Sequence, residues 1–225
     1  MLTSRQIAAS IDHAMLKPFM TVSDIVSGCE TAARYGAASV CVRGCDVKTA
    51  YDILKGTPVK TGTVIGFPHG DCSTAAKVAD TLEAARNGAA EVDMVIPVGM
   101  ALSGEMDYVR TDISSVLKAA HDNGMLLKVI FENCYLNDKL IVELCGLCSE
   151  LKVDFVKTST GFGTYGARIE DVKLMRASTD PSIGVKAAGG IHDLDELLAM
   201  MDAGASRIGA SATEKIVEEA VARGL

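Results

Sequence analysis

A short turn recurs three times in this sequence, and each copy joins a helical stretch to an apolar run. The copies are GAASV at residues 36–40, GAAEV at 88–92 and GASRI at 204–208. Glycine commonly ends a helix because it adopts the left-handed backbone conformation readily. Each copy therefore indicates the same tight connection from a helix into a strand, and the repeat predicts a parallel sheet covered by helices.

The alternation of strands and helices continues along the whole chain, and no two-residue hairpin turn joins two strands. The predicted strands cover residues 11–17, 39–42, 63–68, 91–96, 126–131, 154–161, 184–190 and 207–211, with glycine loops at the ends of the last three. The predicted helices are a short one opened by a capping box at residues 3–6, then 21–36, 46–55, 73–87, 106–123, 137–151, 169–176 and 193–202, and a last one after residue 211.

Eight strands in a chain of 225 residues predict a single-domain (β/α)8 TIM barrel of the α/β class, preceded by a short N-terminal helix. An open doubly wound sheet is the alternative. It would carry a dinucleotide-binding fingerprint after its first strand, where this sequence has none. No linker, low-complexity tract or change in composition divides the chain, so one domain is expected over residues 1–225.

Composition opposes several classes of partner. The formal net charge of −7 argues against nucleic-acid phosphates and anionic membranes, and aromatic residues at 4% argue against a stacking platform for single strands. No apolar run is long enough to span a membrane, and residues 1–6 show no signal-peptide core. Seven cysteines, an odd number in a chain of this length, predict reduced thiols and a cytoplasmic protein.

Four charged residues interrupt the apolar strands: Asp93, Lys128, Lys157 and Lys186. Because side chains alternate along a strand, flanking residues that face the helices would place all four charged groups inside the barrel. A buried ion-pair network that helps to close the barrel is one explanation. It is the weaker one for four residues on successive strands, since ion pairs stabilise little after desolvation.

The same cluster suits carbonyl chemistry. A lysine amine with its ordinary pKa near 10.4 is protonated at neutral pH and is not nucleophilic. A second cation within about 4–6 Å, together with burial, lowers that pKa. We therefore predict Lys157 as a Schiff-base nucleophile, Lys186 as the neighbour that lowers its pKa, and Asp93 as the group that moves protons. Such a site makes or breaks the carbon–carbon bond next to the bound carbonyl carbon.

Glycine loops at the predicted barrel mouth are candidates for binding a phosphate. In TIM barrels the loops after the seventh and eighth strands often hold a phosphate on backbone N–H groups. Here these loops contain Gly189 and Gly190, then Gly209 and Ser211. The glycines would let the backbone approach a ligand closely, and Ser211 would donate from a helix N-terminus. The alternative is that the glycines only make tight turns.

Several other patterns are expected to be structural. Residues 161–166 match G-x-G-x-x-G, but the match lies late in the chain and well before the next helix, so a dinucleotide site is not expected. Cys145 and Cys148 form a C-x-x-C inside an apolar helix, which indicates core cysteines. Cys41 is either a reactive thiol near the mouth or a small core residue. The four histidines show no metal-ligand spacing, so neither a metal nor another cofactor is predicted.

The motifs resemble those of the deoxyribose-phosphate aldolase family over nearly the whole chain. The segments that carry the resemblance are IDH…LKP at residues 11–18, VIGFP at 64–68, EVDMVI at 91–96, LKVI at 127–130, FVKTSTGF at 155–162, VKAAGGI at 185–191 and RIGAS at 207–211. The segments around Lys157 and Lys186 are the most specific.

This resemblance implies a class I, metal-independent aldolase on a TIM barrel. Such an enzyme would reversibly cleave 2-deoxy-D-ribose 5-phosphate into D-glyceraldehyde 3-phosphate and acetaldehyde, in deoxyribonucleotide catabolism. The implied roles are Schiff-base formation for Lys157, pKa tuning and assistance to proton transfer for Lys186, and proton transfer for Asp93. A homodimer is implied as well.

The resemblance also implies the rest of the substrate pocket. Lys128, Asp12, Thr160 and Gly161 would line it, and the glycine and serine loops would hold the phosphate. The chain departs from the family pattern at residues 43–44, where Arg-Gly follows the second strand, at Asn133, which stands in place of threonine, and at the C-terminus, where no tyrosine is found. These departures concern rate and substrate preference rather than the class of reaction.

Two alternative functions fit the same residues. The chain could be a Schiff-base aldolase or transaldolase-like barrel with another donor, or a non-enzymatic protein that binds a phosphorylated metabolite. An assay with several sugar phosphates separates the first alternative from the predicted enzyme. Reductive trapping of acetaldehyde on Lys157 separates the second.

Overall fold

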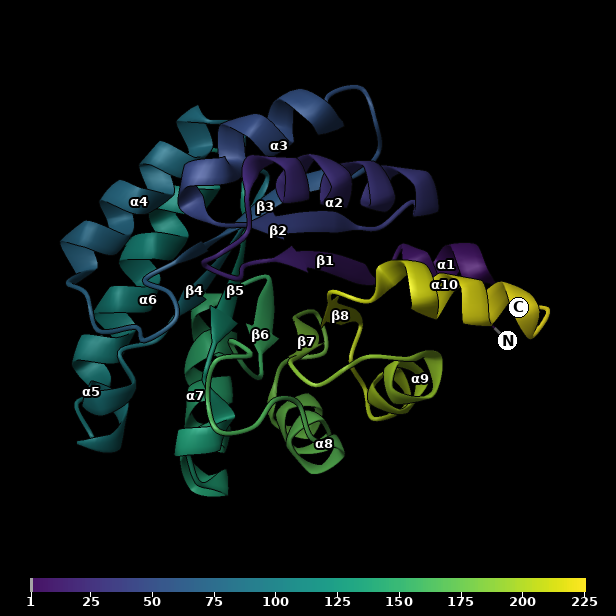
Figure 1. Ribbon diagram of the computed structural model, residues 1–225. Coiled ribbons are helices and arrows are strands. Elements are labelled where there is room, and N and C mark those ends of the chain that lie inside the picture. The colour runs from purple at the N-terminus through teal and green to yellow at the C-terminus, as the bar shows by residue number, and fades with distance from the viewer. Residues whose placement is uncertain (1) are drawn as a thin grey trace.

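Eight parallel strands close into a barrel in the computed structural model, which describes residues 2–225 (Figure 1). The strands are β1 Ile11–Met15, β2 Ser39–Val42, β3 Lys60–Ile65, β4 Glu91–Val95, β5 Leu126–Ile130, β6 Phe155–Lys157, β7 Gly184–Ala188 and β8 Arg207–Ala210. They pair in chain order, and β8 pairs with β1, which closes the sheet. The predicted TIM barrel is confirmed.

Helices cover the outside of the barrel. They are α1 Ser4–Ala8, α2 Val22–Tyr35, α3 Val47–Leu54, α4 Thr74–Arg86, α5 Val98–Leu102, α6 Met106–His121, α7 Asp138–Leu151, α8 Ile169–Ser178, α9 Leu194–Asp202 and α10 Thr213–Ala222, with 3-10 turns η1 Gly44–Asp46 and η2 Asn133–Tyr135. Figure 1 shows the predicted N-terminal helix, α1, packed beside α10. The short helix α5 has no counterpart among the predictions. Within residues 2–225, no helix combines the length and the apolar character needed to cross a membrane.

Local signals in the sequence explain several helix ends. Thr3 and Thr21 both form capping boxes, in which the threonine side chain accepts the backbone N–H three residues further on. Gly36 ends α2 with φ at +73° and donates its N–H to Ala32 O. These contacts satisfy backbone groups that a helix leaves unpaired at its ends. The first copy of the repeated glycine turn therefore acts as predicted.

The strands end earlier than predicted on the side where the glycine loops lie. β3 covers Lys60–Ile65 rather than 63–68, because Gly66 turns to a φ of +61° and leaves the extended conformation. β6 ends at Lys157 itself, and the residues after it form a loop. The carboxyl ends of the strands are where TIM-barrel active sites lie, so this loop belongs to the functional face.

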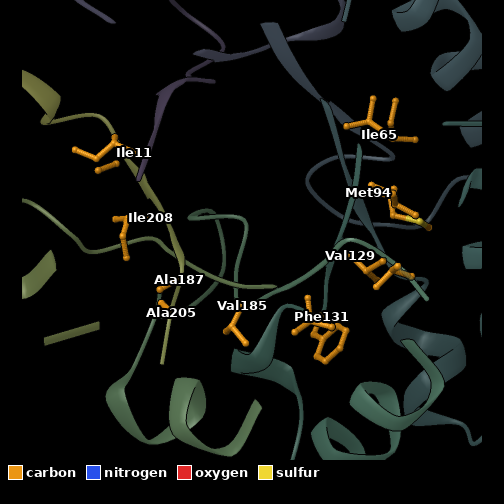
Figure 2. Packing of buried hydrophobic residues seen from close by; sticks show 14 of the residues in the cluster. Ile11, Ile65, Met94, Val129, Phe131, Val185, Ala187, Ala205 and Ile208 are labelled. Carbon is orange, nitrogen blue, oxygen red and sulfur yellow. The ribbon is translucent and has the colours of Figure 1, made fainter. Parts of the chain in front are cut away.

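An apolar layer fills the space between the strands and the helices. It contains Met94, Val129 and Val185, which are neighbours of charged residues on β4, β5 and β7 (Figure 2). All three are fully buried. Since successive side chains on a strand point to opposite faces, the charged residue beside each of them points into the barrel, as predicted.

Candidate active site

Five charged side chains from five strands meet inside the barrel. Asp12 comes from β1, Asp93 from β4, Lys128 from β5, Lys157 from β6 and Lys186 from β7. Each is at most 3% exposed. The strand register places Asp93 beside Lys128, and Lys157 beside Lys186. The closed sheet thus brings together residues that lie as much as 174 positions apart in the sequence.

Asp93 lies at the centre of this network. Its Oδ2 accepts hydrogen bonds from Lys157 Nζ and Lys186 Nζ, both at 2.7 Å. Its Oδ1 accepts a hydrogen bond from Lys128 Nζ at 2.9 Å. A single carboxylate therefore contacts all three lysines that the sequence predicted to share the barrel interior.

Asp12 makes a second set of contacts. Its Oδ2 accepts from Lys186 Nζ at 2.5 Å and lies 3.4 Å from Lys128 Nζ. Its Oδ1 accepts from Arg207 and from Ser39 Oγ, each at 2.7 Å. Asp12 thus belongs to the charged network, and it has no ion pair with Lys157 among the contacts within residues 2–225.

Three members of the network were not indicated by the sequence: Glu91, Arg207 and Ser39. Glu91 Oε2 accepts from Lys128 Nζ at 2.7 Å and lies 3.4 Å from Arg207. Glu91 stands two residues before Asp93 on β4, so side-chain alternation could have placed both inside the barrel. Ser39 and Arg207 each open a strand, where polar residues more often meet solvent, and they carried no comparable signal.

The network contains one more basic group than acidic groups. The basic groups are Lys128, Lys157, Lys186 and Arg207, and the acidic groups are Asp12, Glu91 and Asp93. Full ionisation would leave one uncompensated positive charge away from water, which is unfavourable. Burial lowers the pKa of Lys157, and the charge of Lys186 lowers it further, although Asp93 opposes both. Lys157 is therefore the basic group that gives up its proton most readily.

Lys186 and Asp93 keep their charges. Burial disfavours the charged form of Lys186, but Asp12 and Asp93 outweigh burial and raise the pKa of Lys186 above its usual value. Burial also disfavours the charged form of Asp93, yet the adjacent lysines hold the pKa of Asp93 well below its usual range. The site therefore places a lysine with a lowered pKa and a charged ammonium group on the same oxygen atom of an ionised carboxylate.

A cavity of about 250 Å³ is lined by Lys157 and Lys186. Its wall contains seven of the residues predicted to bind substrate, namely Asp12, Thr160, Gly161, Gly189, Gly190, Gly209 and Ser211. Lys128 was predicted to line the pocket and does not, because its ammonium is taken up by Glu91 and Asp93 deeper in the barrel. The wall also contains Lys17, Phe162 and His192, which the sequence did not indicate.

A larger hollow of about 790 Å³ shares Leu16 and Phe162 with this cavity. It contains neither of the two lysines that line the smaller cavity. The position of the charged groups, rather than the volume of the hollow, therefore identifies the candidate active site. Within residues 2–225, no three His, Cys, Asp or Glu side chains are grouped as a metal site.

The G-x-G-x-x-G match at residues 161–166 serves loop packing. A Cβ on Gly166 would lie 2.2 Å from Gly189 O, so the loop after β6 approaches the loop after β7 at backbone distance. Such an approach requires glycine. The first two residues of the match, Gly161 and Phe162, line the cavity.

The cysteines of the C-x-x-C pattern lie in the core. Cys145 and Cys148 are fully buried on α7, and neither forms a disulfide. Burial raises the pKa of Cys145 to about 11 and raises that of Cys148 well above its usual value. Cys41 lines the cavity, but burial raises its pKa to about 11 as well. All three are buried thiols that resist ionisation.

Comparison with known proteins supplies independent information. Residues 6–223 match the family described as DeoC/LacD family aldolase. The chain belongs to this aldolase family. A deoxyribose-phosphate aldolase from Caldanaerobacter subterraneus subsp. tengcongensis is 50% identical over 220 residues, which cover 97% of this aldolase and 95% of the relative. A deoxyribose-phosphate aldolase from Aciduliprofundum boonei is 48% identical and covers 96% of this chain and 98% of its own.

Solved structures agree with this assignment. A tetrameric deoxyribose phosphate aldolase from Aeropyrum pernix superimposes with a TM-score of 0.91 at 28% identity, covering 96% of this aldolase and 92% of that chain. The family predicted from the motifs is confirmed.

Proposed function

We propose that this protein is a class I aldolase that reversibly cleaves 2-deoxy-D-ribose 5-phosphate into D-glyceraldehyde 3-phosphate and acetaldehyde, as part of deoxyribonucleotide catabolism. One observation carries the proposal. Lys157 Nζ and Lys186 Nζ share Asp93 Oδ2 beside a cavity that both lysines line. Membership of the aldolase family and the relatives named deoxyribose-phosphate aldolase support this substrate.

The first step is attack of the neutral Lys157 amine on C1, the aldehyde carbon of the open-chain sugar. A C–N bond forms, the carbonyl oxygen takes up a proton, and loss of water leaves a protonated Schiff base. Lys186 is the proposed source of the proton for the departing oxygen, because it stays charged and also lines the cavity. The Schiff base then carries positive charge beside Asp93.

The second step breaks the bond between C2 and C3. A base removes the proton from the C3 hydroxyl, the electron pair of the C2–C3 bond moves into the Schiff base, and glyceraldehyde 3-phosphate leaves as the enamine forms. Asp93, which the lysines keep ionised, is the proposed proton acceptor, directly or through water. Protonation of the enamine at C2 and hydrolysis of the Schiff base release acetaldehyde and restore the amine.

The proposed phosphate site lies between the loops after β7 and β8. Gly189 and Gly190 have φ values of +85° and +77°, a left-handed conformation that favours glycine and exposes backbone N–H groups. Gly209 and Ser211 line the same cavity. Lys17 also lines it and would add the positive charge that a phosphate needs.

Further proposals concern the protein as a whole. We propose that residues 1–225 act as one catalytic domain and that the protein works in the cytoplasm, an assignment supported by seven free cysteines. The family resemblance supports a homodimer, whereas the Aeropyrum pernix structure is tetrameric. Light scattering on the purified protein distinguishes these two assemblies.

Reductive trapping tests the proposed nucleophile. Incubation with acetaldehyde and borohydride should add an ethyl group to Lys157, as located by peptide mass mapping. An adduct on Lys186 would reverse the proposed roles, and no adduct on either lysine would reject Schiff-base chemistry. Steady-state cleavage of 2-deoxy-D-ribose 5-phosphate, compared with other sugar phosphates, then tests the substrate.

A further inference from the structure

Glu132 is an unusual residue directly beyond the end of β5. It has a φ of +57° and a ψ of +63°, and it is only 3% exposed. Residues with a side chain adopt this left-handed conformation rarely, and strained residues of this kind cluster at functional sites. The other non-glycine residue with positive φ within residues 2–225 is Lys152, which ends helix α7. Glu132 instead precedes the 3-10 turn η2, and its side chain makes no capping hydrogen bond to that turn.

The Glu132 carboxylate holds Thr160 through both of its oxygens. Oε1 accepts the backbone N–H of Thr160 at 3.1 Å, and Oε2 accepts the Thr160 hydroxyl group. The hydroxyl oxygen in turn accepts the backbone N–H of Phe162 at 3.0 Å. Two hydrogen bonds therefore connect Glu132 to Thr160, and a third, within the segment, connects Thr160 to Phe162.

This connection extends the pairing of β5 with β6 beyond the strands. Phe131 N donates to Lys157 O and Asn133 N donates to Thr158 O, both at 3.0 Å. The side chain of Glu132 continues this pairing at Thr160. The loop after β6 is thus held in register with the end of β5.

The segment held by Glu132 forms one wall of the cavity. Thr160, Gly161 and Phe162 all line it, whereas Glu132 does not. A Cβ on Gly189 would lie 3.3 Å from Gly161 Cα, so this wall packs against the loop proposed to bind phosphate. Glu132 therefore reaches the phosphate end of the cavity through Thr160.

Phe162 lines the cavity and is 42% exposed. It packs edge-on against Phe67, with ring centroids 5.3 Å apart. Lys17 Nζ lies 4.9 Å from the centroid of the Phe162 ring. The position of Phe162 thus influences where the Lys17 charge stands, and the Phe162 backbone is itself bonded to Thr160.

The use of a carboxylate at this buried position also requires a reason. Both oxygens of Glu132 are bonded to the uncharged groups of Thr160. A carboxylate is expensive to bury with uncharged partners alone, and closing a turn does not require one. A carboxylate supplies two acceptors on one planar group, which suits a backbone N–H and a hydroxyl of the same residue.

We propose that Glu132 is a positioning residue that sets the Thr160–Phe162 wall against the phosphate end of the cavity and so determines the preference for a phosphorylated sugar. This inference rests on the proposed aldolase function. It assigns Glu132 no contact with Lys157 and no part in Schiff-base formation. Its effect therefore belongs to binding of the phosphorylated substrate and not to attack on the carbonyl.

The test compares cleavage of 2-deoxy-D-ribose 5-phosphate with cleavage of unphosphorylated 2-deoxy-D-ribose in wild type, Glu132→Ala, Glu132→Gln and Thr160→Val. For Glu132→Ala we expect kcat/KM on the phosphorylated sugar to fall by about 10-fold or more, mainly through KM, as loss of two hydrogen bonds implies. The value of kcat/KM on the unphosphorylated sugar should fall by roughly threefold or less. Glu132→Gln keeps one acceptor and should recover part of the loss, and acetaldehyde trapping on Lys157 should proceed at the wild-type rate.

A double variant checks the connection through Thr160. Thr160→Val removes the hydroxyl group that donates to Glu132. In the double variant of Thr160→Val and Glu132→Gln, the loss of kcat/KM on the phosphorylated sugar should be smaller than the sum of the losses, as free energies, in the two single variants. Equal losses on both sugars, an unchanged preference, or strictly additive effects would overturn the inference. If Glu132→Ala does not fold, Glu132→Gln and Thr160→Val carry the same comparison. A wild-type enzyme that cleaves neither sugar would reject the proposed function and this inference together.

Discussion

Replacing Lys186 by leucine removes one positive charge from beside Lys157 while keeping an apolar side chain in the barrel. In the wild type, burial and the Lys186 ammonium depress the pKa of Lys157. Without Lys186, the network retains the cations Lys128 and Arg207 against three carboxylates. Lys157 then balances the charge by keeping its proton, and a protonated amine cannot attack a carbonyl carbon.

The size of this effect follows from the shared oxygen. Lys157 Nζ and Lys186 Nζ each lie 2.7 Å from Asp93 Oδ2, so the two nitrogens are at most about 5.4 Å apart. With an effective dielectric constant of about 20, two unit charges at that distance repel by about 3 kcal/mol. Removing this repulsion lowers the fraction of neutral amine roughly 100-fold.

The assay is the dependence of kcat/KM on pH. We expect kcat/KM of Lys186→Leu to fall roughly 100-fold at pH 7 because Lys157 becomes protonated. Any loss of proton donation by Lys186 would lower kcat/KM further. The limb that rises with pH reports deprotonation of Lys157 in the free enzyme, and it should move to higher pH in the variant. The variant should therefore recover relative to the wild type as the pH increases. The rate of acetaldehyde trapping on Lys157 should show the same displacement.

Lys118→Leu is the matched control. Its side chain is 77% exposed and pairs with Asp122 on the surface, so the change removes the same charge far from the network. We expect its pH profile to match that of the wild type, because solvent and salt screen surface charges. If Lys186→Leu folds, as judged by circular dichroism, and its rising limb is unchanged or moves to lower pH, the reasoning about charge balance is refuted.

Three further predictions concern stability and loop packing. Burial lowers the pKa of His13 to about 4, so between pH 4 and 6.5 the folded state binds fewer protons than the unfolded state. The free energy of unfolding should therefore fall by about 3 kcal/mol as the pH falls from 6.5 to 4. His13→Gln should remove that slope in urea titrations; a slope that persists would assign it to other groups. Lys77→Met leaves the buried Asp112 without the ammonium group that lies 2.6 Å away, and it should lower the free energy of unfolding in urea by about 3–5 kcal/mol. The double variant Lys77→Met with Asp112→Leu should regain most of that stability. A double variant that regains none would contradict the pairing. Gly166→Ala places a Cβ 2.2 Å from a backbone oxygen and should abolish most activity or folding. The control Gly146→Ala, in α7, has open space around the new Cβ and should keep the stability within about 1 kcal/mol of the wild type in thermal unfolding. Equal behaviour of the two variants would reject the steric argument.

More of the fold than of the candidate site could be predicted from the sequence. Strand and helix order followed from apolar runs, caps and glycine turns, which are local signals. The inward direction of Asp93, Lys128 and Lys186 followed from their apolar neighbours, again a local pattern. Family membership followed from motifs that span the chain. The roles of the site residues stay proposals that the trapping and pH experiments test.

The missed residues share a physical explanation. Glu91 and Arg207 act only through partners on other strands, and their contacts depend on the register around a closed sheet. The depth of Lys128 in the barrel likewise depends on which carboxylates surround it. Glu132 carried no signal of its own, because its bonds to Thr160 join positions 28 residues apart.

The sequence by itself therefore determined a parallel barrel, the family, and four of the charged residues inside the barrel, because periodicity, capping and motif content are properties of neighbouring residues. Only the tertiary structure decided that Lys157 and Lys186 share one oxygen of Asp93 and that a fourth cation, Arg207, unbalances the charges. Electrostatic interactions depend on distance and burial rather than on position in the chain. For that reason the depressed pKa of Lys157, on which the proposed chemistry depends, is a property of the closed barrel.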